Sequence, residues 1–362
     1  MITGADLLYL RLAIELAERG LCTTTPNPRV GCVIVGDGQV LGRGWHQWHG
    51  QAHAEVNAIA AAGGEVAGAT VYVSLEPCCI HGKTPPCTDA LIDAKVARVV
   101  VATVDLDPRV NGAGLRQLSD AGIVVENADL EEARAVNPGH RQRLLEGRPL
   151  IRIKIAGSLD GRGAMASGES QWITGPAARA DVQYWRARSC AVVTGIGTVL
   201  ADDPLLTVRD ERFRVDGRFR QPLRVVVDSN LRTPEDAKLF AAEGDVLLVH
   251  TRASGGRHPA AECVACGTGQ VDLEGLVEEL VRRRCNEVLI EAGPKLAGAF
   301  IQQGLWDEAI VYLAPKLLGS TARSVLEVDI EHLEDAVIGR IVDCIPIGED
   351  LRVRLRRTVG VP

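Results

Sequence analysis

The chain has 362 residues, of which 46% are hydrophobic and 24% are charged, and its formal net charge at pH 7 is −7. This length is sufficient for two hydrophobic cores, and the composition is typical of a globular protein. The acidic balance argues against a basic nucleic-acid-binding module, and no apolar run reaches the roughly 20 residues of a membrane-spanning helix. Charged residues interrupt the N-terminal segment, so we expect no secretory signal and a cytoplasmic protein with mostly reduced cysteines.

Helix and strand patterns alternate through the first part of the chain. Thr3 and Asp6 form a capping-box pattern, and Gly20 is placed to end the helix that begins there. Strands are expected at residues 29–35, 39–45, 70–75 and 97–104, and helices at 53–62 and 88–94. This alternation predicts a three-layer α/β sandwich.

A domain boundary is expected near residues 146–149, giving one domain at 1–148 and another at 149–362. In the second domain, strands are expected at residues 150–155, 191–194, 223–228, 246–250, 287–291 and 308–313, and helices at 177–188 and 273–284. The second domain is therefore predicted to be a separate α/β domain with its own core.

Four residues of the first domain point to a catalytic metal site. His53 and Glu55 open a predicted helix, Cys78 follows a predicted strand, and Cys87 precedes another helix. One imidazole and two thiolates suit zinc and leave a fourth position for water, whose pKa zinc lowers from about 15.7 towards about 7. Glu55 is not needed as a ligand, so we expect it to move protons between this water and a leaving amine. His-x-Glu with a later Pro-Cys is the signature of zinc nucleobase deaminases.

The same residues would also fit a buried histidine with two inert core thiols, or a zinc ion with a purely structural role. Cysteine is among the most frequently buried residue types, so an isolated Cys would favour the first of these. The coincidence of His53, two cysteines, a spare carboxylate and predicted helix starts favours catalysis. A non-catalytic zinc-binding or interaction protein would have no use for Glu55.

Two regions of the second domain carry chemistry. Residues 158–161 and 167–174 are polar, glycine-rich segments that follow a strand. Glu291 ends a strand and Gly293 precedes a predicted helix, where backbone N–H groups can bind a phosphate. A simple tight turn is the alternative for this segment, and the lack of a Gly-x-Gly-x-x-Gly pattern does not favour a Rossmann domain.

The interval between Cys78 and Cys87 differs from the Pro-Cys-x-x-Cys pattern of nucleoside and nucleic-acid deaminases. It contains Lys83-Thr84-Pro85-Pro86 immediately before Cys87. With residues 25–28, 30–35 and 44–46, this insert resembles the deaminase of bacterial riboflavin biosynthesis.

That resemblance implies a cytidine-deaminase-like fold and substrate contacts at Asn27, His46 and Lys83. Lys83 suits a phosphate ester because it is a cation. Asn27 lies between prolines, where shaping a turn is the alternative, and for His46 the alternative is a place in the core. Cys79-Ile80 departs from the family, since many relatives have Ser-His there.

The span from about Leu150 onward resembles the reductase part of the same enzyme, which has a dihydrofolate-reductase-like α/β fold. The matching stretches are residues 154–161, 168–174, 197–204, 227–229 and 314–319. The resemblance implies NADPH contacts at Ala156, Trp172, Thr198, Asp202, Ser229, Gly293, Pro294, Lys295, Leu296, Ala297, Gly298 and Ala299. It implies substrate contacts at Ser170, Arg186, Leu205, Arg209 and Glu291. Arg186 and Arg209 fit a sugar phosphate, although a solvated surface charge is the alternative for each.

The two halves together make the resemblance nearly full length, to the bifunctional diaminohydroxyphosphoribosylaminopyrimidine deaminase and 5-amino-6-(5-phosphoribosylamino)uracil reductase family. It implies an enzyme with zinc and NADPH that deaminates 2,5-diamino-6-ribosylamino-4(3H)-pyrimidinone 5′-phosphate. It would then reduce the ribosyl chain to give 5-amino-6-ribitylaminouracil 5′-phosphate. It also implies a homo-oligomer, a dimer or tetramer, formed through the reductase domain. A zinc deaminase of another base or nucleoside, fused to an unrelated reductase-like domain, is the alternative.

Overall fold

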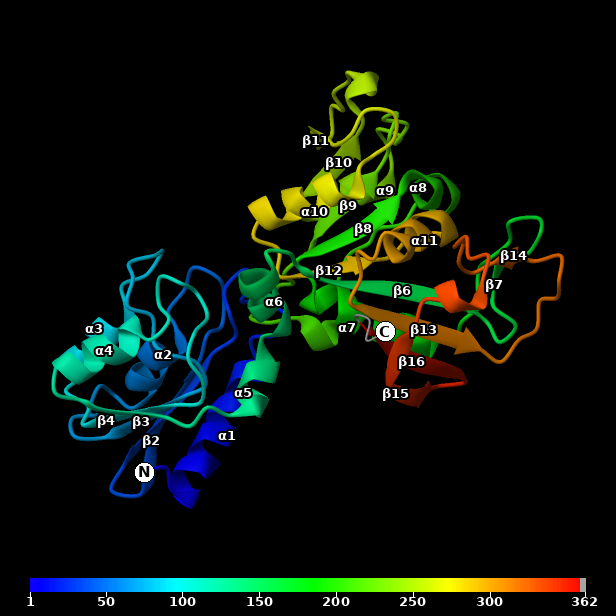
Figure 1. Cartoon of the computed structure of the whole chain (residues 1–362). Helices are drawn as coiled ribbons and strands as arrows, with labels where there is room; N and C mark the ends of the chain where they lie inside the picture. Colours follow the sequence, from blue (N-terminus) through cyan, green and yellow to red (C-terminus); the bar gives the residue numbers. More distant parts are fainter. Residues whose placement is uncertain (359–362) are drawn as a thin grey trace. The chain divides into compact units, whose positions relative to one another are not determined.

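The computed structural model describes residues 1–358 and divides the chain into two compact units, Met1–Gly147 and a second that begins at Arg148 (Figure 1). Each unit contains a sheet of its own with helices packed on it. Within the described residues, no helix is long and apolar enough to cross a membrane.

The first unit contains a five-stranded sheet in the order β2-β1-β3-β4-β5. Strand β1 pairs antiparallel with β2 and β3, whereas β3, β4 and β5 run parallel. The strands are β1 (Gly31–Gly36), β2 (Gln39–Trp45), β3 (Thr70–Val73), β4 (Arg98–Val101) and β5 (Val124–Asn127). The helices are α1 (Gly4–Glu18), α2 (Ala54–Ala61), α3 (Cys87–Asp93), α4 (Ala113–Asp120), α5 (Glu131–Val136) and α6 (Pro138–Glu146).

Alternating apolar residues of these strands bury both faces of the sheet. Ile34 packs in one core cluster with residues of α2, α3 and α4, whereas the neighbouring Val33 packs in another with residues of α1 and α5. This is the side-chain period of a strand whose two faces are both covered. The predicted three-layer sandwich is confirmed.

Local sequence signals set the helices that carry the site. Thr3 accepts a hydrogen bond from the Asp6 backbone N–H, and the Asp6 carboxylate accepts one from the Thr3 N–H, so the predicted capping box is confirmed. A Cβ on Gly44 of β2 would lie 2.3 Å from the Ala54 carbonyl oxygen. Only glycine therefore allows α2 to approach β2 this closely, and α2 is the helix that follows His53.

The second unit contains a nine-stranded sheet in the order β11-β10-β9-β8-β12-β6-β13-β16-β15. Strands from β11 to β13 in this order are parallel, and β16 and β15 add an antiparallel edge. The strands of this sheet are β6 (Leu150–Ser158), β8 (Ala191–Gly195), β9 (Leu223–Val227), β10 (Val246–His250), β11 (Glu262–Ala265), β12 (Glu287–Ile290), β13 (Glu308–Ala314), β15 (Gly339–Ile347) and β16 (Asp350–Arg357). A separate short pair consists of β7 (Arg162–Ala164) and β14 (Arg323–Ser324).

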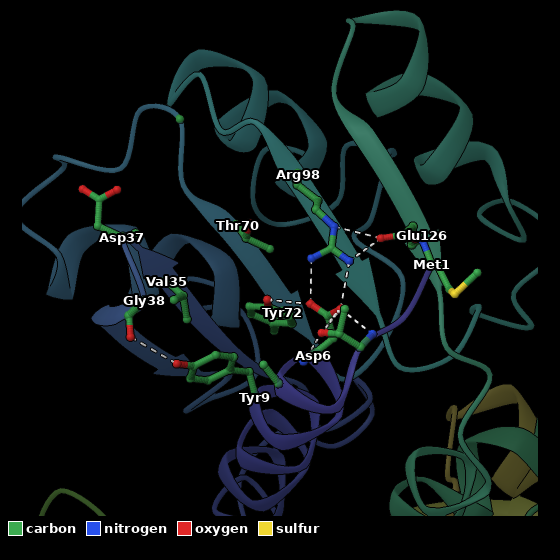
Figure 2. Close-up of a pocket in the computed structure, with 14 residues that line it drawn as sticks. Met1, Asp6, Tyr9, Val35, Asp37, Gly38, Thr70, Tyr72, Arg98 and Glu126 are labelled. Carbon is green, nitrogen blue, oxygen red and sulfur yellow. Dashed lines mark hydrogen bonds and ion pairs between the residues drawn. The ribbon is translucent and has the colours of Figure 1, made fainter.

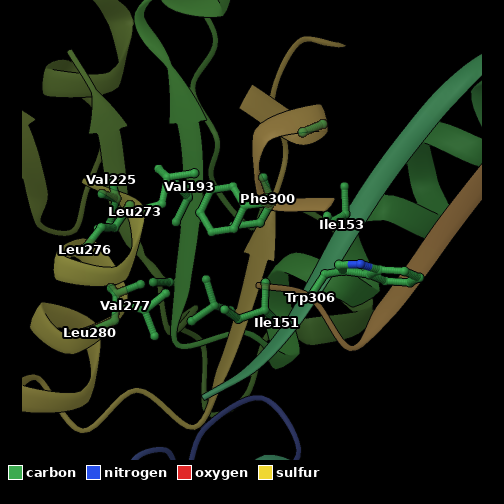
Figure 3. Packing of buried hydrophobic residues seen from close by; sticks show 14 of the residues in the cluster. Ile151, Ile153, Val193, Val225, Leu273, Leu276, Val277, Leu280, Phe300 and Trp306 are labelled. Atoms are coloured by element: carbon green, nitrogen blue, oxygen red, sulfur yellow. The ribbon is translucent and has the colours of Figure 1, made fainter. Parts of the chain in front are cut away.

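Helices cover both faces of the second sheet. They are α7 (Pro176–Arg188), α8 (Ile196–Asp202), α9 (Lys238–Ala241), α10 (Leu273–Arg282) and α11 (Pro294–Gln302). Figure 3 shows Leu276 and Leu280 of α10 and Phe300 of α11 packed near strand side chains that include Ile151 and Val193. The apolar residues of α10 recur at helical spacing, and burying that stripe fixes the helix on the sheet.

Candidate active sites in the two units

The three predicted metal ligands converge near the carboxyl end of β3. His53 is the N-cap of α2, Cys87 is the first residue of α3, and Cys78 lies in the loop after β3. This strand ends at Val73, two residues before the predicted end at residue 75. The His53 Nδ1 atom lies 3.5 Å from Cys78 Sγ and 3.3 Å from Cys87 Sγ. All three ligand atoms lie within 4.8 Å of one another. An imidazole and two thiolates at this spacing fit a zinc ion by geometry and by donor chemistry.

The neighbouring thiol of Cys79 points elsewhere. Its Sγ atom donates to the Arg109 carbonyl oxygen at 3.9 Å and is not part of the three-residue group. Cys78, hydrogen-bonded by the Cys87 thiol and by His53, has a lowered pKa, which favours the thiolate that a metal requires.

Glu55 lies in the first turn of α2, directly beside this group. Its side chain is 2% exposed, and its Oε2 atom makes no hydrogen bond among the described residues. Burial and the nearby Cys78 raise the pKa of Glu55 to about 7. A buried carboxyl with an open oxygen, next to metal ligands but outside their set, is suited to accept and return a proton.

Asn27 and His46 meet at the rim of the metal group. The Asn27 Nδ2 and His46 Nε2 atoms are 3.3 Å apart, and the His46 and His53 rings pack edge to face with centroids 4.9 Å apart. Burial lowers the pKa of His46 to about 4, so the ring is neutral at pH 7. Lys83 is exposed and its Nζ atom lies 3.0 Å from the Nε2 atom of His49, a residue that the sequence patterns did not single out.

A separate hollow of about 560 Å³ lies at the amino ends of β3 and β4, the end of the sheet opposite to Cys78 (Figure 2). Arg98 bridges Asp6 and Glu126 there, donating to Asp6 Oδ1 at 2.6 Å and to Glu126 Oε2 at 2.8 Å. The Tyr72 hydroxyl donates to the same Asp6 carboxylate at 2.7 Å. None of the predicted site residues lines this hollow, and its Arg98, Asp6 and Glu126 side chains are paired with one another.

The second unit brings four charged side chains together. Arg186 of α7 donates two hydrogen bonds to Glu291, at 2.8 and 2.7 Å, and a third to the Thr207 carbonyl oxygen at 3.1 Å. Burial opposes ionisation of Glu291, but Arg186, with Lys154 and Arg209, lowers the pKa of that carboxyl to about 2.

Lys154 belongs to this cluster and was not among the predicted site residues. It lies in β6, and burial lowers its pKa, while Glu291 acts in the opposite direction. The available signal was the alternation of two cations, Arg152 and Lys154, with apolar residues in the predicted strand of residues 150–155. A buried charged side chain in such a strand requires a partner.

The helix starts of α8 and α11 lie side by side over the carboxyl ends of β8 and β12. Gly293 is the N-cap of α11, and a Cβ at this position would lie 3.7 Å from the Thr198 hydroxyl. A larger side chain would therefore fill the space between the two helix starts. Backbone N–H groups in the first turn of a helix lack partners within it and suit a phosphate. This cradle fits the dinucleotide phosphates of NADPH.

Of the predicted cofactor contacts at residues 293–299, the later ones bond and pack within α11 itself. The Ala297 N–H bonds the Gly293 carbonyl, and Ala297 is buried. A Cβ on Gly298 would lie 1.7 Å from the Glu327 carbonyl oxygen, so helix packing alone explains this glycine. The free N–H groups are therefore in the first turn, at Lys295 and Leu296.

Other predicted contacts lie on loops and strands around the same edge. The Trp172 ring is 62% exposed, with the Arg179 guanidinium 4.4 Å from its centroid, and the adjacent Gln171 donates to Asp202 at 3.2 Å. The remaining positions lie in β6, after β9, before α7 and after α8, and these are Ala156, Ser229, Ser170 and Leu205. Within residues 1–358, no hydrogen bond joins the Ser170 side chain to the cluster around Glu291.

Comparison with known proteins gives matches to both units. The model of the cytidine and deoxycytidylate deaminase zinc-binding region matches residues 4–103, and the model of the RibD C-terminal domain matches residues 149–350. The chain is 46% identical to the riboflavin biosynthesis protein RibD of Escherichia coli, over 97% of this chain and 99% of that one. The structure of Acinetobacter baumannii RibD superimposes with a TM-score of 0.91 at 44% identity, covering 98% of this chain and 99% of that one. The deaminase/reductase of Thermotoga maritima superimposes with a TM-score of 0.86 at 31% identity, covering 98% of this chain and 99% of that one.

The fold and the sites define a zinc-dependent deaminase joined to an NADPH-dependent reductase. The second unit has the dihydrofolate-reductase-like fold of RibD reductases. The chain belongs to the RibD family, the bifunctional deaminase/reductases of riboflavin biosynthesis. Zinc and NADPH are its cofactors.

Proposed function

We propose that the chain converts 2,5-diamino-6-ribosylamino-4(3H)-pyrimidinone 5′-phosphate to 5-amino-6-ribitylaminouracil 5′-phosphate by deamination and then reduction. The observation that carries the deaminase assignment is the buried Glu55 carboxyl beside the His53, Cys78 and Cys87 group. A solved relative from Thermotoga maritima bears the name of both activities, which supports this pair of substrates.

His53, Cys78 and Cys87 would hold the zinc ion in the deaminase unit. Zinc bound there supplies a Lewis acid that makes water nucleophilic at neutral pH. Glu55 receives the proton of the attacking water on its Oε2 atom, which has no hydrogen bond of its own, and passes it to the departing ammonia. Burial of Glu55 keeps bulk water from competing for this proton.

Asn27 and His46 would orient the pyrimidine. The neutral His46 ring donates from Nδ1 to the Ala52 carbonyl oxygen at 3.1 Å, so its Nε2 atom accepts from the Asn27 amide. This arrangement fixes the Asn27 side chain with its oxygen available as an acceptor for a ring N–H or amino group. Lys83 would provide the cation for the ribose phosphate.

In the reductase unit, NADPH supplies the hydride when bound. The first turn of α11, beside Thr198, would hold its phosphates, while the exposed Trp172 ring offers an apolar surface. Arg186 donates its hydrogen bonds to Glu291 and to the Thr207 carbonyl oxygen, so its role is to position Glu291. Arg209, whose guanidinium makes no ion pair within residues 1–358, is the better cation for the substrate phosphate.

We also propose a domain boundary and an oligomeric state for the chain. A boundary between 148 and 149 is supported by the compact unit that ends at Gly147 and by the family match that starts at residue 149. A homo-oligomer formed through the reductase domain is also part of the proposal, and apolar side chains on β15, the edge strand of the larger sheet, support it. Ile341 is 62% exposed there, and Val342 and Ile345 are exposed as well. The proposal places the enzyme in the cytoplasm, where its cysteines would stay reduced.

Turnover of the proposed substrate tests the assignment. The purified chain with zinc should release ammonia from the diaminopyrimidine ribosyl phosphate, and NADPH should be oxidised only after that release. Ammonia release from cytidine in place of this substrate would contradict the proposal, as would a failure to oxidise NADPH with the deaminated intermediate supplied.

A further inference from the structure

Glu76 is a buried carboxylate two residues before Cys78. Its side chain is almost inaccessible, with the residue 4% exposed. Its Oε1 atom accepts backbone hydrogen bonds from Gly114 at 3.0 Å and Leu115 at 3.3 Å, and its Oε2 atom accepts from Gly112 at 2.9 Å and Asp105 at 3.2 Å. Both oxygens are thus held by four N–H groups of residues 105–115, the loop after β4 and the first turn of α4.

These bonds serve α4 as well as Glu76. The first N–H groups of a helix have no partner within it, and a carboxylate at this end also interacts favourably with the helix dipole. Gly112, the N-cap of α4, offers no side chain for capping. The Glu76 carboxylate therefore caps α4 from another segment of the chain and ties the start of this helix to the loop that carries Cys78.

A close backbone approach strengthens this connection. A Cβ on Gly114 would lie 2.2 Å from the Pro77 carbonyl oxygen, so only glycine fits between α4 and the segment before Cys78. The Glu76 N–H donates to the Thr103 carbonyl oxygen at 3.0 Å, which continues the pairing of β3 with β4 beyond the end of the strands.

The side of Cys78 that faces α3 is held separately. The Thr88 N–H donates to the Cys78 carbonyl oxygen at 3.2 Å, and the Cys87 N–H approaches Cys78 Sγ at 3.4 Å. The position of the Cys78 sulfur therefore depends on two supports, α3 on one side and Glu76 with the start of α4 on the other.

We propose that Glu76 is a positioning residue for the metal site, which holds Cys78 at the distance from His53 and Cys87 that zinc requires. This role rests on the proposed metal-binding function of the three residues. Groups that orient metal ligands without touching the metal commonly change metal affinity by about 10- to 100-fold when replaced.

Glu76→Gln tests this role because it keeps the size of the side chain but replaces one acceptor oxygen by an NH2 group. That group would face N–H donors, so at least one pair of backbone hydrogen bonds is lost. We expect zinc affinity, measured on the full chain by competition with a chelator, to fall by about 10- to 100-fold. The thiolate-to-metal absorption of the cobalt(II)-loaded protein should weaken or shift, because it reports the contact of Cys78 with the metal.

Two further variants separate positioning from general stability. Gly114→Ala removes no carboxylate, but its Cβ would lie 2.2 Å from the Pro77 carbonyl oxygen and 3.2 Å from Glu76 Oε1. It forces this segment away from α4, so it should also lower zinc affinity and alter the cobalt spectrum. Glu126→Gln is the matched control, since it removes a carboxylate from the Arg98 network at the other end of the same sheet. It should leave zinc affinity and the cobalt spectrum within about twofold of wild type.

The outcomes distinguish this role from the metal site itself. A wild-type chain that binds no zinc would overturn both the site and the role of Glu76. Wild-type zinc binding with an unchanged affinity and cobalt spectrum in Glu76→Gln would overturn the role of Glu76 alone. If Glu76→Gln does not fold, Gly114→Ala decides, and wild-type metal properties in that variant would contradict the proposal.

Discussion

Arg186 and Glu291 form a buried ion pair beside the proposed reductase site, and replacing Arg186 by methionine should destabilise the second unit. The two side chains are 9% and 15% exposed and share two hydrogen bonds of 2.7 and 2.8 Å. Methionine fills much of the same volume but leaves Glu291 without its main partner. Breaking a buried pair in this way typically costs about 3–5 kcal/mol.

The pKa of Glu291 gives a second measure of how much the ion pair stabilises the folded protein. It is about 2 in the folded protein against an ordinary value of 4.5, which at about 1.4 kcal/mol per pKa unit corresponds to roughly 3 kcal/mol. Because the folded-state pKa is the lower one, this stabilisation is complete above pH 4.5 and is lost as the pH falls towards 2. Lys154 and Arg209 remain near Glu291 in the variant. We therefore expect Arg186→Met to lower the free energy of unfolding by about 3 kcal/mol at pH 7 and by much less at pH 3.

Urea unfolding of the full-length chain, followed by tryptophan fluorescence, measures this difference. Trp185 precedes Arg186 in α7 and is buried, so its emission reports the unfolding of the second unit. Arg282→Met is the control: it removes a guanidinium that is 61% exposed, and Glu279 keeps its ion pair with Arg283, so stability should change by less than about 0.5 kcal/mol. Equal destabilisation by Arg186→Met at pH 7 and pH 3 would refute the reasoning, because the loss would not arise from an ionised Glu291.

Three other predictions address the rest of the molecule. Removal of residues 149–362 should leave a folded fragment that binds zinc and deaminates, since the first unit has its own sheet and core; a fragment that cannot fold would contradict the boundary. Ile341→Lys should shift the oligomer towards monomer in sedimentation, whereas Leu8→Lys, at another exposed apolar position, should not; identical behaviour would argue against β15 as the interface. Arg98→Met should lower the stability of the first unit by about 2 kcal/mol, because Asp6 is 3% exposed and loses its cation, while zinc content should not change. Loss of zinc in this variant would show that the two ends of the sheet are coupled.

Much of the fold was predictable because the core elements follow simple periodicities. Largely buried runs such as 191–194 and 246–250 are predicted as strands, and both are observed. The terminal strands β15 and β16 were not predicted because most of β15 is exposed and β16 alternates arginine with apolar residues. Such a pattern does not distinguish an edge strand from a surface loop, and the pairing of β16 with β13, which places β15 at the edge of the sheet, is a tertiary property.

The metal group was predictable because the required residue types stand close to element boundaries. Glu76 was not, although it stands two residues from Cys78, because its function depends on backbone N–H groups of residues 105–115. Those donors come from a helix start that the sequence patterns did not indicate. Lys154 was missed for a similar reason, since only the fold brings β6 beside Glu291.

Zinc content measured together with ammonia release, in the wild-type chain and in Glu55→Gln, tests the central claim most directly. The variant keeps His53, Cys78 and Cys87, so it should retain one zinc ion per chain. Its rate of ammonia release from the diaminopyrimidine ribosyl phosphate should fall by about 100-fold or more, because glutamine cannot transfer the proton. Unchanged turnover with full zinc content would contradict the role of Glu55 and the proposed mechanism.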